Sequence, residues 1–255
     1  MKLFSLFRCS LGMIVLVCCS VNVAANDLNK SVDEFTGINM SVSGDIDLVQ
    51  SNEHRVALKL VRGNLDELEV VVKRGTLELK RDCGFGIRCK RPHLRIEGTI
   101  YYETIDRLNM NGSGRMTAKD MTTPGLDVAI NGAGDIEFGA IRSQKFRLKI
   151  NGAGDVSVEE GEFDDFSVAI NGAGNIDIEE GTTSTCEVKL VGSGDFRGSG
   201  LISSRTEVKV VGAGKARVHA ADILDVSIAG SGDVKYEGTP KVSSKVSGSG
   251  KIASL

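Results

Sequence analysis

The feature that constrains this chain most is a short glycine motif that recurs at a nearly constant interval through its second half. Each copy reads Gly-x-Gly, with Ala or Ser in the middle. The second glycines of successive copies are 20, 20, 20, 20, 20, 18 and 18 residues apart. The motif glycines are Gly112, Gly114, Gly132, Gly134, Gly152, Gly154, Gly172, Gly174, Gly192, Gly194, Gly212, Gly214, Gly230, Gly232, Gly248 and Gly250. Such a period is typical of a solenoid, in which each repeat forms one coil and stacks on its neighbours.

The residues between the glycines alternate between apolar and polar, which is the pattern of a β-strand. Leu126, Val128 and Ile130 precede one motif in this way, and Ile136 and Phe138 follow it. Each repeat is therefore predicted to be two short strands that meet at a glycine corner, followed by a polar connection to the next repeat.

Two architectures fit this unit: a parallel β-helix, and a series of hairpins that turn at the Asn-Gly pairs. Hairpins are disfavoured, since later corners replace Asn with Val191, Val211, Ala229 and Ser247 while the period stays constant. Stacked coils explain a constant register directly. We therefore expect an all-β protein, a parallel β-helix (solenoid) with coils of about 20 residues.

Residues 26–105 contain strand-like segments without the exact repeat, at residues 38–42, 45–49, 55–61, 68–73, 77–81 and 94–101. Residues 41–45 are a faint copy of the corner, and Arg74-Gly75 is a plausible hairpin turn. A solenoid needs an atypical end unit to cover its apolar core. We expect residues 26–105 to begin and cap the stack and residues 106–255 to form the regular coils of the same domain.

The first 25 residues are predicted to be a signal peptide. Lys2 and Arg8 give a positive start, a mostly apolar segment follows, and cleavage is expected after Ala25. The apolar segment is shorter than the about 20 residues that span a membrane. We expect export to the periplasm, the cell surface or the medium, and no membrane span. A lipoprotein signal at Cys18 or Cys19 is less favoured. Such signals usually have Gly, Ala or Ser just before the lipidated cysteine, whereas Val17 precedes Cys18 and Cys18 precedes Cys19.

Three cysteines remain once the leader is removed. Cys83 and Cys89 enclose a short loop with two glycines and are candidates for a disulfide in an oxidising compartment. A metal site made by the same two cysteines and His93 is the alternative, at a spacing unlike common zinc sites. Cys186 aligns with Phe146 and other core positions of the repeat, so we expect it to be a buried thiol.

The sequence resembles a known family, the "Putative auto-transporter adhesin, head GIN domain" family of bacterial exported proteins, which has no established activity. The resemblance rests on residues 35–38 and 42–45, on the serial glycine corners, and on the ending at residues 234–241 and 246–250. It implies a β-helical fold, export and an adhesin-like role. Residues 100–103 depart from the family, whose members usually place a proline before the first regular coil.

Composition and motifs exclude several functions. The formal net charge of −3 and pI of about 5.7 provide no basic stripe for nucleic acid. The residues that follow the corners include Asp135 and Asp155 and could form a calcium ladder, but Arg115, Lys215 and Lys251 occupy the same column. We therefore expect no metal and no cofactor. These aspartates are expected to accept backbone hydrogen bonds at the corners.

An enzyme is the first alternative, because some β-helix proteins cleave polysaccharides with carboxylates grouped on one face. The connections supply an acidic cluster of Glu159, Glu160, Asp164, Asp165, Glu179 and Glu180. These connections are too short to wall a cleft or to raise a carboxylate pKa by burial. We therefore expect a protein without enzymatic activity.

A binding role is the main expectation, with an unknown protein or cell-envelope polymer as partner. Arg147, Lys149, Lys189 and Lys209 form an outward row that is a candidate binding face, with Glu187 and Glu207 beside it. A merely solubilising surface is the commoner explanation of such a row. Self-association is the further alternative: the end coils, above all residues 246–255, could stack between molecules as in a structural scaffold.

Overall fold

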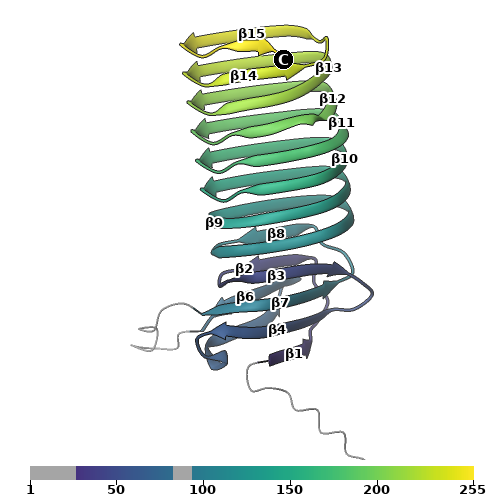
Figure 1. Ribbon diagram of the computed structural model, residues 1–255. Coiled ribbons are helices and arrows are strands. Elements are labelled where there is room, and N and C mark those ends of the chain that lie inside the picture. The colour runs from purple at the N-terminus through teal and green to yellow at the C-terminus, as the bar shows by residue number, and fades with distance from the viewer. Residues whose placement is uncertain (1–26, 83–93) are drawn as a thin grey trace, which may run out of the picture.

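The computed structural model describes residues 27–82 and 94–255, which form a rod of stacked β-coils (Figure 1). Consecutive coils pair in parallel, from β9 through β13 to the last strands. The predicted fold, a parallel β-helix with coils of 20 residues, is therefore confirmed. The predicted signal peptide, Cys83, Cys89 and His93 lie outside the described residues.

The bounds of the elements follow the chain in two groups. The N-terminal part consists of β1 (Asp27–Ser31), β2 (Gly37–Met40), β3 (Ser43–Gln50), β4 (Arg55–Arg62), the 3₁₀ helix η1 (Leu65–Glu67), β5 (Leu68–Lys73), β6 (Thr76–Arg81), β7 (Arg95–Tyr102) and β8 (Arg107–Met110). The coils that follow are β9 (Ser113–Gly152), β10 (Val156–Gly172), β11 (Ile176–Gly192), β12 (Phe196–Gly212), β13 (Lys215–Gly230), β14 (Asp233–Glu237), β15 (Lys241–Gly248) and β16 (Ile252–Ser254). Within the described residues, no helix is long and apolar enough to cross a membrane.

Each coil lies on the previous one in register, so equivalent residues form columns along the rod. Val156 of β10 pairs with Ile176 of β11, and Gly172 pairs with Gly192, twenty residues further on in both cases. The register shifts where β13 stacks on β12, between Gly198 and Ile202 and again between Ser203 and Arg205. The shifts occur because the coil formed by β13 is two residues shorter than the preceding coils: Phe196 pairs with Ala216, but Thr206 pairs with Leu224.

The inward columns form one continuous apolar core. Phe138, Phe146, Phe163 and Phe166 pack with ring centroids 5.2–5.8 Å apart. Each buried aromatic or aliphatic side chain contributes about 1.5–3 kcal/mol relative to an exposed one. The column of Phe146 and Phe166 continues through Cys186, as the sequence predicts, and Cys186 is 5 % exposed.

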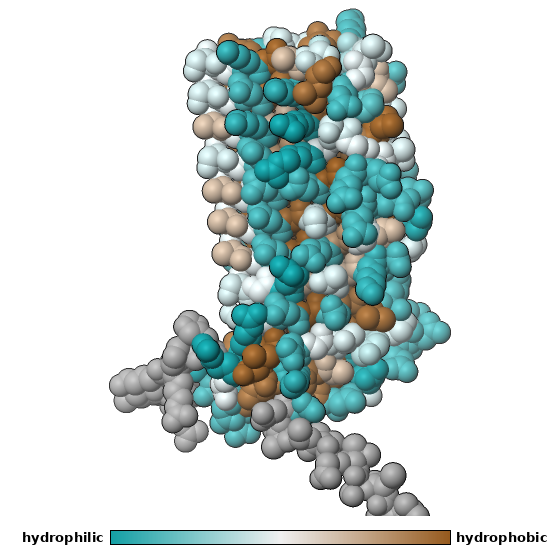
Figure 2. Space-filling view, viewed as in Figure 1, coloured by the Kyte–Doolittle hydropathy of each residue, from teal (hydrophilic) through white to brown (hydrophobic). Residues whose placement is uncertain are grey.

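The corners need glycine for two different reasons. The first glycine of most motifs has a positive φ, such as 145° at Gly152, which other residues rarely adopt. Both glycines of a motif also lie close to the backbone of the previous coil: a Cβ added to Gly152 would be 2.1 Å from the carbonyl oxygen of Gly132, and one added to Gly154 would be 2.1 Å from that of Gly134. The small residues between the glycines form a row along one edge of the rod (Figure 2).

Polar ladders connect the corners of successive coils. Asn131 donates from its side-chain amide to Asn111 at 2.9 Å, Asn151 donates to Asn131 at 2.8 Å, and Asn171 donates to Asn151 at 3.1 Å. The ladder begins at Asn39, which accepts from Asn111 at 2.7 Å. Each side-chain amide thus fills a hydrogen-bonding position of the amide on the preceding coil, as in other stacks of identical strands in register.

The N-terminal part continues the stack with segments that are not consecutive in the chain. β2 and β3 lie directly against β8 and β9, with Gly44 on Gly114, so residues 41–45 form a true corner as predicted. β6 and β7 lie on the other side of β2 and β3. The antiparallel strands β4, β1 and β5 close this end. β5 and β6 meet at Arg74 and Gly75, both with positive φ, which confirms the predicted hairpin turn.

Replacing Gly154 with Ala should destabilise the protein by about 2–3 kcal/mol, because the new methyl group forces two coils apart. Guanidinium unfolding followed by far-UV circular dichroism would measure this. Gly125→Ala is the matched control, since its Cβ would meet nothing closer than 3.8 Å. Equal stability of the two variants would contradict the packing constraint at the corners.

Burial, together with the smaller effect of the nearby Glu187 carboxylate, raises the pKa of the Cys186 thiol to about 12. The thiol should therefore react with an aromatic disulfide reagent at pH 8 at least 100-fold more slowly in the folded protein than in denaturant. Stability should also fall as the pH rises from about 9 to about 12, where the unfolded chain releases this proton and the folded chain keeps it.

Peptide mapping after modification would identify Cys186 separately from Cys83 and Cys89. Rapid modification of Cys186 in the native protein would contradict its buried position.

The same experiment without reductant tests the predicted disulfide, because bridged Cys83 and Cys89 stay unmodified even in denaturant.

Candidate functional site

The predicted binding row lies on one outer face of the coils and consists of two adjacent columns. The inward neighbours Leu148, Val188 and Val208 are at most 2 % exposed, so the residues on either side of them point outward. Register places Lys149, Ala169, Lys189 and Lys209 in one column. Arg147 instead lies in a second column, followed there by Ser167, Glu187, Glu207 and Asp225. We call the surface made by these two columns the lysine face.

The charges of the lysine face are unequally compensated. The Arg147 guanidinium contacts the Asp127 carboxylate of the preceding coil at 3.2 Å. Lys149, Lys189 and Lys209 form no ion pair with any residue in the described ranges, and all three are exposed. Lys189 and Lys209 are direct neighbours in their column, and so are Glu187 and Glu207 in theirs.

A shallow pocket of about 320 Å³ opens at the N-terminal part of the lysine face. Ala129 and Ala169 lie on either side of Lys149 in its column, and their small side chains leave space there. Arg107, Asp127 and Arg147 line the same pocket. The pocket therefore combines apolar walls with a charged rim and could hold a small side chain or sugar group of a partner.

The structure divides the predicted acidic cluster between different places. Glu159, Glu160, Glu179 and Glu180 line one pocket of about 780 Å³, which we call the acidic pocket. All four glutamates are exposed. Asp164 lines a different pocket, and Asp165 accepts a hydrogen bond from the Thr185 hydroxyl at 2.8 Å. The six carboxylates therefore do not form a single group.

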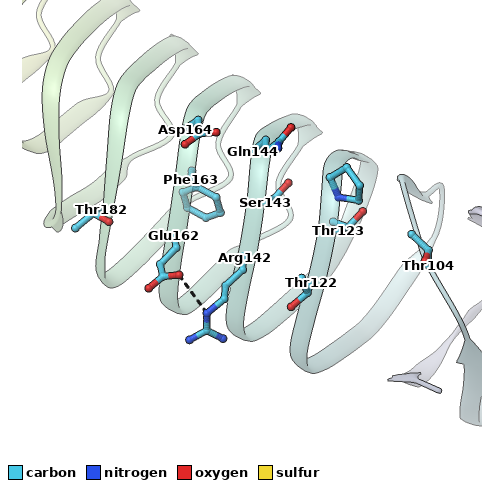
Figure 3. Close-up of a pocket in the computed structure, with 11 residues that line it drawn as sticks. Thr104, Thr122, Thr123, Arg142, Ser143, Gln144, Glu162, Phe163, Asp164 and Thr182 are labelled. Carbon is cyan, nitrogen blue, oxygen red and sulfur yellow. Dashed lines mark hydrogen bonds and ion pairs between the residues drawn. The ribbon is translucent and has the colours of Figure 1, made fainter.

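Another pocket, of about 600 Å³, was not predicted from the sequence (Figure 3). It lies over bends within β9 and β10, where Arg142 and Glu162 of neighbouring coils face each other at 3.1 Å. Its hydroxyl groups are used within the fold: Thr123 donates to the Ile105 carbonyl at 2.8 Å, and Ser143 donates to the Lys145 carbonyl at 3.0 Å. These side chains hold the bends of the coils. Only their recurrence in the connections could have pointed to this pocket.

The aspartates that follow the corners bind the backbone of the next coil. Asp135 accepts from the Asp155 amide at 3.1 Å, and Asp155 accepts from the Asn175 amide at 2.8 Å. The same contact recurs from Lys215 to Asp195 and from Lys251 to Asp233, each at 3.0 Å. In the part of the chain that the structure describes, no three His, Cys, Asp or Glu side chains are grouped to hold a metal ion.

Comparison with solved structures shows similar folds in bacterial proteins. A putative lipid binding protein from Parabacteroides distasonis has a TM-score of 0.82 and 23 % identity, covering 91 % of this chain and 98 % of its own. A putative adhesin from Parabacteroides merdae has a TM-score of 0.81 and 18 % identity, covering 90 % and 95 %. A putative adhesin from Bacteroides fragilis has a TM-score of 0.62 and 24 % identity, covering 90 % and 96 %. At these identities the likeness establishes the fold alone.

None of the curated proteins matches this sequence. Residues 34–240 match the family described as "Putative auto-transporter adhesin, head GIN domain", a span that runs from the first core residues of the N-terminal part to the residue before β15. This span includes the corner at residues 41–45 and most of the regular coils, which carry the sequence resemblance. The chain therefore belongs to the family described as "Putative auto-transporter adhesin, head GIN domain".

Proposed function

We propose that this protein is an exported, non-enzymatic interaction module of the adhesin type, which binds a protein or cell-envelope polymer along the lysine face. Export rests on the predicted leader, and the adhesin role rests on the family. The observation that supports this face is that Lys149, Lys189 and Lys209 share one column, are exposed, and form no ion pair with the residues that the structure describes.

Other columns of the rod pair some opposite charges between neighbouring coils, although Glu160 also lies beside Glu180, and Arg197 beside Arg217. Arg197 contacts Asp177 at 2.8 Å, and Arg142 contacts Glu162 at 3.1 Å. Each arginine comes from a coil next to that of its carboxylate, so the stack readily pairs charges between coils.

The lysine face stacks like charges in both of its columns. Lys189 lies beside Lys209, and Glu187 lies beside Glu207, at the strand spacing of about 4.8 Å. Like charges directly opposite each other on neighbouring strands destabilise a sheet. A bound partner with acidic groups over the lysine column, and basic groups over the acidic column, would relieve this repulsion.

The acidic pocket supports an enzyme less well. A carboxylic acid that donates a proton near neutral pH usually needs burial to raise its pKa. All four residues of the acidic pocket are exposed, so none has the burial that such an acid needs; they are Glu159, Glu160, Glu179 and Glu180. A glycan-cleaving enzyme remains the alternative that the following experiment separates from binding.

Changing Lys149, Lys189 and Lys209 together to Glu should weaken binding to cell-envelope fractions or purified cell-wall glycan at least tenfold, because it reverses the charge of the column. Co-sedimentation over a range of protein concentrations would measure the saturable binding. Changing Lys215, Arg217 and Lys235 to Glu is the matched control. These three residues are exposed and lie in columns outside the lysine face, and their substitution changes the net charge by the same amount.

Equal loss in both triple variants would show a general charge effect and would contradict the lysine face as the binding surface. Wild-type protein that binds neither material would contradict the proposed function. Glycan that becomes shorter with wild-type protein, but not after Glu159, Glu160, Glu179 and Glu180 are changed to Gln, would show an enzyme instead.

A further inference from the structure

The C-terminal end of the rod exposes an edge strand over the core. β15 pairs with β13 on one side, and within the described residues no strand pairs with its other side. All eight residues of β15 are exposed. Exposed apolar side chains lie at this end of the rod, where Figure 1 places β15: Val242 is 39 %, Val246 42 % and Leu255 58 % exposed. Such an edge is a template for pairing with another strand.

The two ends of the rod differ in construction. At the N-terminal end, the coils give way to β4, β1 and β5, which run antiparallel to their neighbours. At the C-terminal end, β15 keeps the parallel register of the regular coils, with Val242 on Leu224 and Val246 on Ile228. The inward columns therefore reach this end, and its valines are covered from one side.

The sequence of β15 matches itself when two copies run antiparallel. Around Ser244 as centre, Val242 of one copy lies opposite Val246 of the other, on the side that faces the core. On the outer side, Lys241 lies opposite Ser247 and Lys245 lies opposite Ser243. Apolar residues thus meet apolar residues, and no lysine meets a lysine.

Shifted registers fit worse. A centre one residue away, at Ser243 or Lys245, places lysines opposite each other, as Lys241 with Lys245 or as Lys245 with itself. A centre at Val242 or Val246 leaves one valine beyond the paired residues. Like charges opposite each other destabilise strand pairs. The lysines that would protect an edge against indiscriminate pairing therefore also select one register.

We propose that two copies of this protein associate end to end through β15, antiparallel and about a two-fold axis at Ser244. The arrangement is isologous, so it closes after two copies and cannot grow into a fibre. The charges of the lysine face agree with it. Within one copy, the lysine column continues from Lys209 to Lys245. Across the two-fold axis, Lys245 lies opposite Ser243 of the second copy, and the next residue in that column is the second copy's Asp225. This inference does not depend on the lysine face binding a partner.

Sedimentation velocity of the protein, produced with its own leader and purified after export, would show a concentration-dependent monomer–dimer equilibrium. Val246→Lys should weaken the dimer at least tenfold, because it places a charge opposite Val242 of the second copy. Val211→Lys is the matched control: Val211 is 36 % exposed, but it lies on a coil away from the end. Circular dichroism would establish that both variants are folded.

A cysteine substitution tests the register directly. Ser244→Cys should form a disulfide-linked dimer under mild oxidation, because opposite Cβ atoms on antiparallel strands are about 5 Å apart. Ser247→Cys should not, since the two sulfurs would be about 20 Å apart along the strands.

A protein that stays monomeric at all concentrations would overturn the proposal. Equal dimers of wild type and Val246→Lys would do the same, and so would a crosslink in the Ser247→Cys variant with none in the Ser244→Cys variant. Complexes of β15 with a different protein and no self-association would show that the edge serves another partner.

Discussion

The structure depends on how closely successive backbones approach at the glycine corners. A single methyl group at Gly154 would lie 2.1 Å from the carbonyl oxygen of the coil below, so glycine there is a condition for stacking at the strand spacing. Close stacking keeps equivalent residues in columns. The phenylalanine core, the asparagine ladder and the lysine face are all columns of this kind, and they therefore share one physical cause.

The exact period allowed the regular coils to be predicted. Corner spacing indicated the register, and the register alone placed Cys186 on Phe166. The N-terminal part could not be predicted in the same way, because no period links β2 to β6 and β8, its neighbours in the sheet. β1 was missed for a simpler reason: its sequence, DLNKS, is polar and pairs only at an edge.

The candidate site was predictable as a face but not in its details. The alternation of apolar and polar residues indicated that Arg147 and Lys149 both point outward. It did not show that the two residues belong to different columns, as they do in the stack. Reading the sequence at intervals of 20 residues would have separated them and would have found Ala129 and Ala169 on either side of Lys149. The pockets over the connections depend on side-chain packing at the bends, which periodicity does not describe.

A stack of coils also determines how binding strength can increase. Each coil adds about 4.8 Å of face without disturbing the others, since contacts are made only between neighbours. An end-to-end dimer would double the length of the face with a single strand pairing and would present two lysine columns to one polymer. Two linked sites gain avidity only if the partner spans both. A long, regular partner would therefore be held more tightly than a short one with the same groups, which is the selectivity expected of a rod that binds envelope polymers.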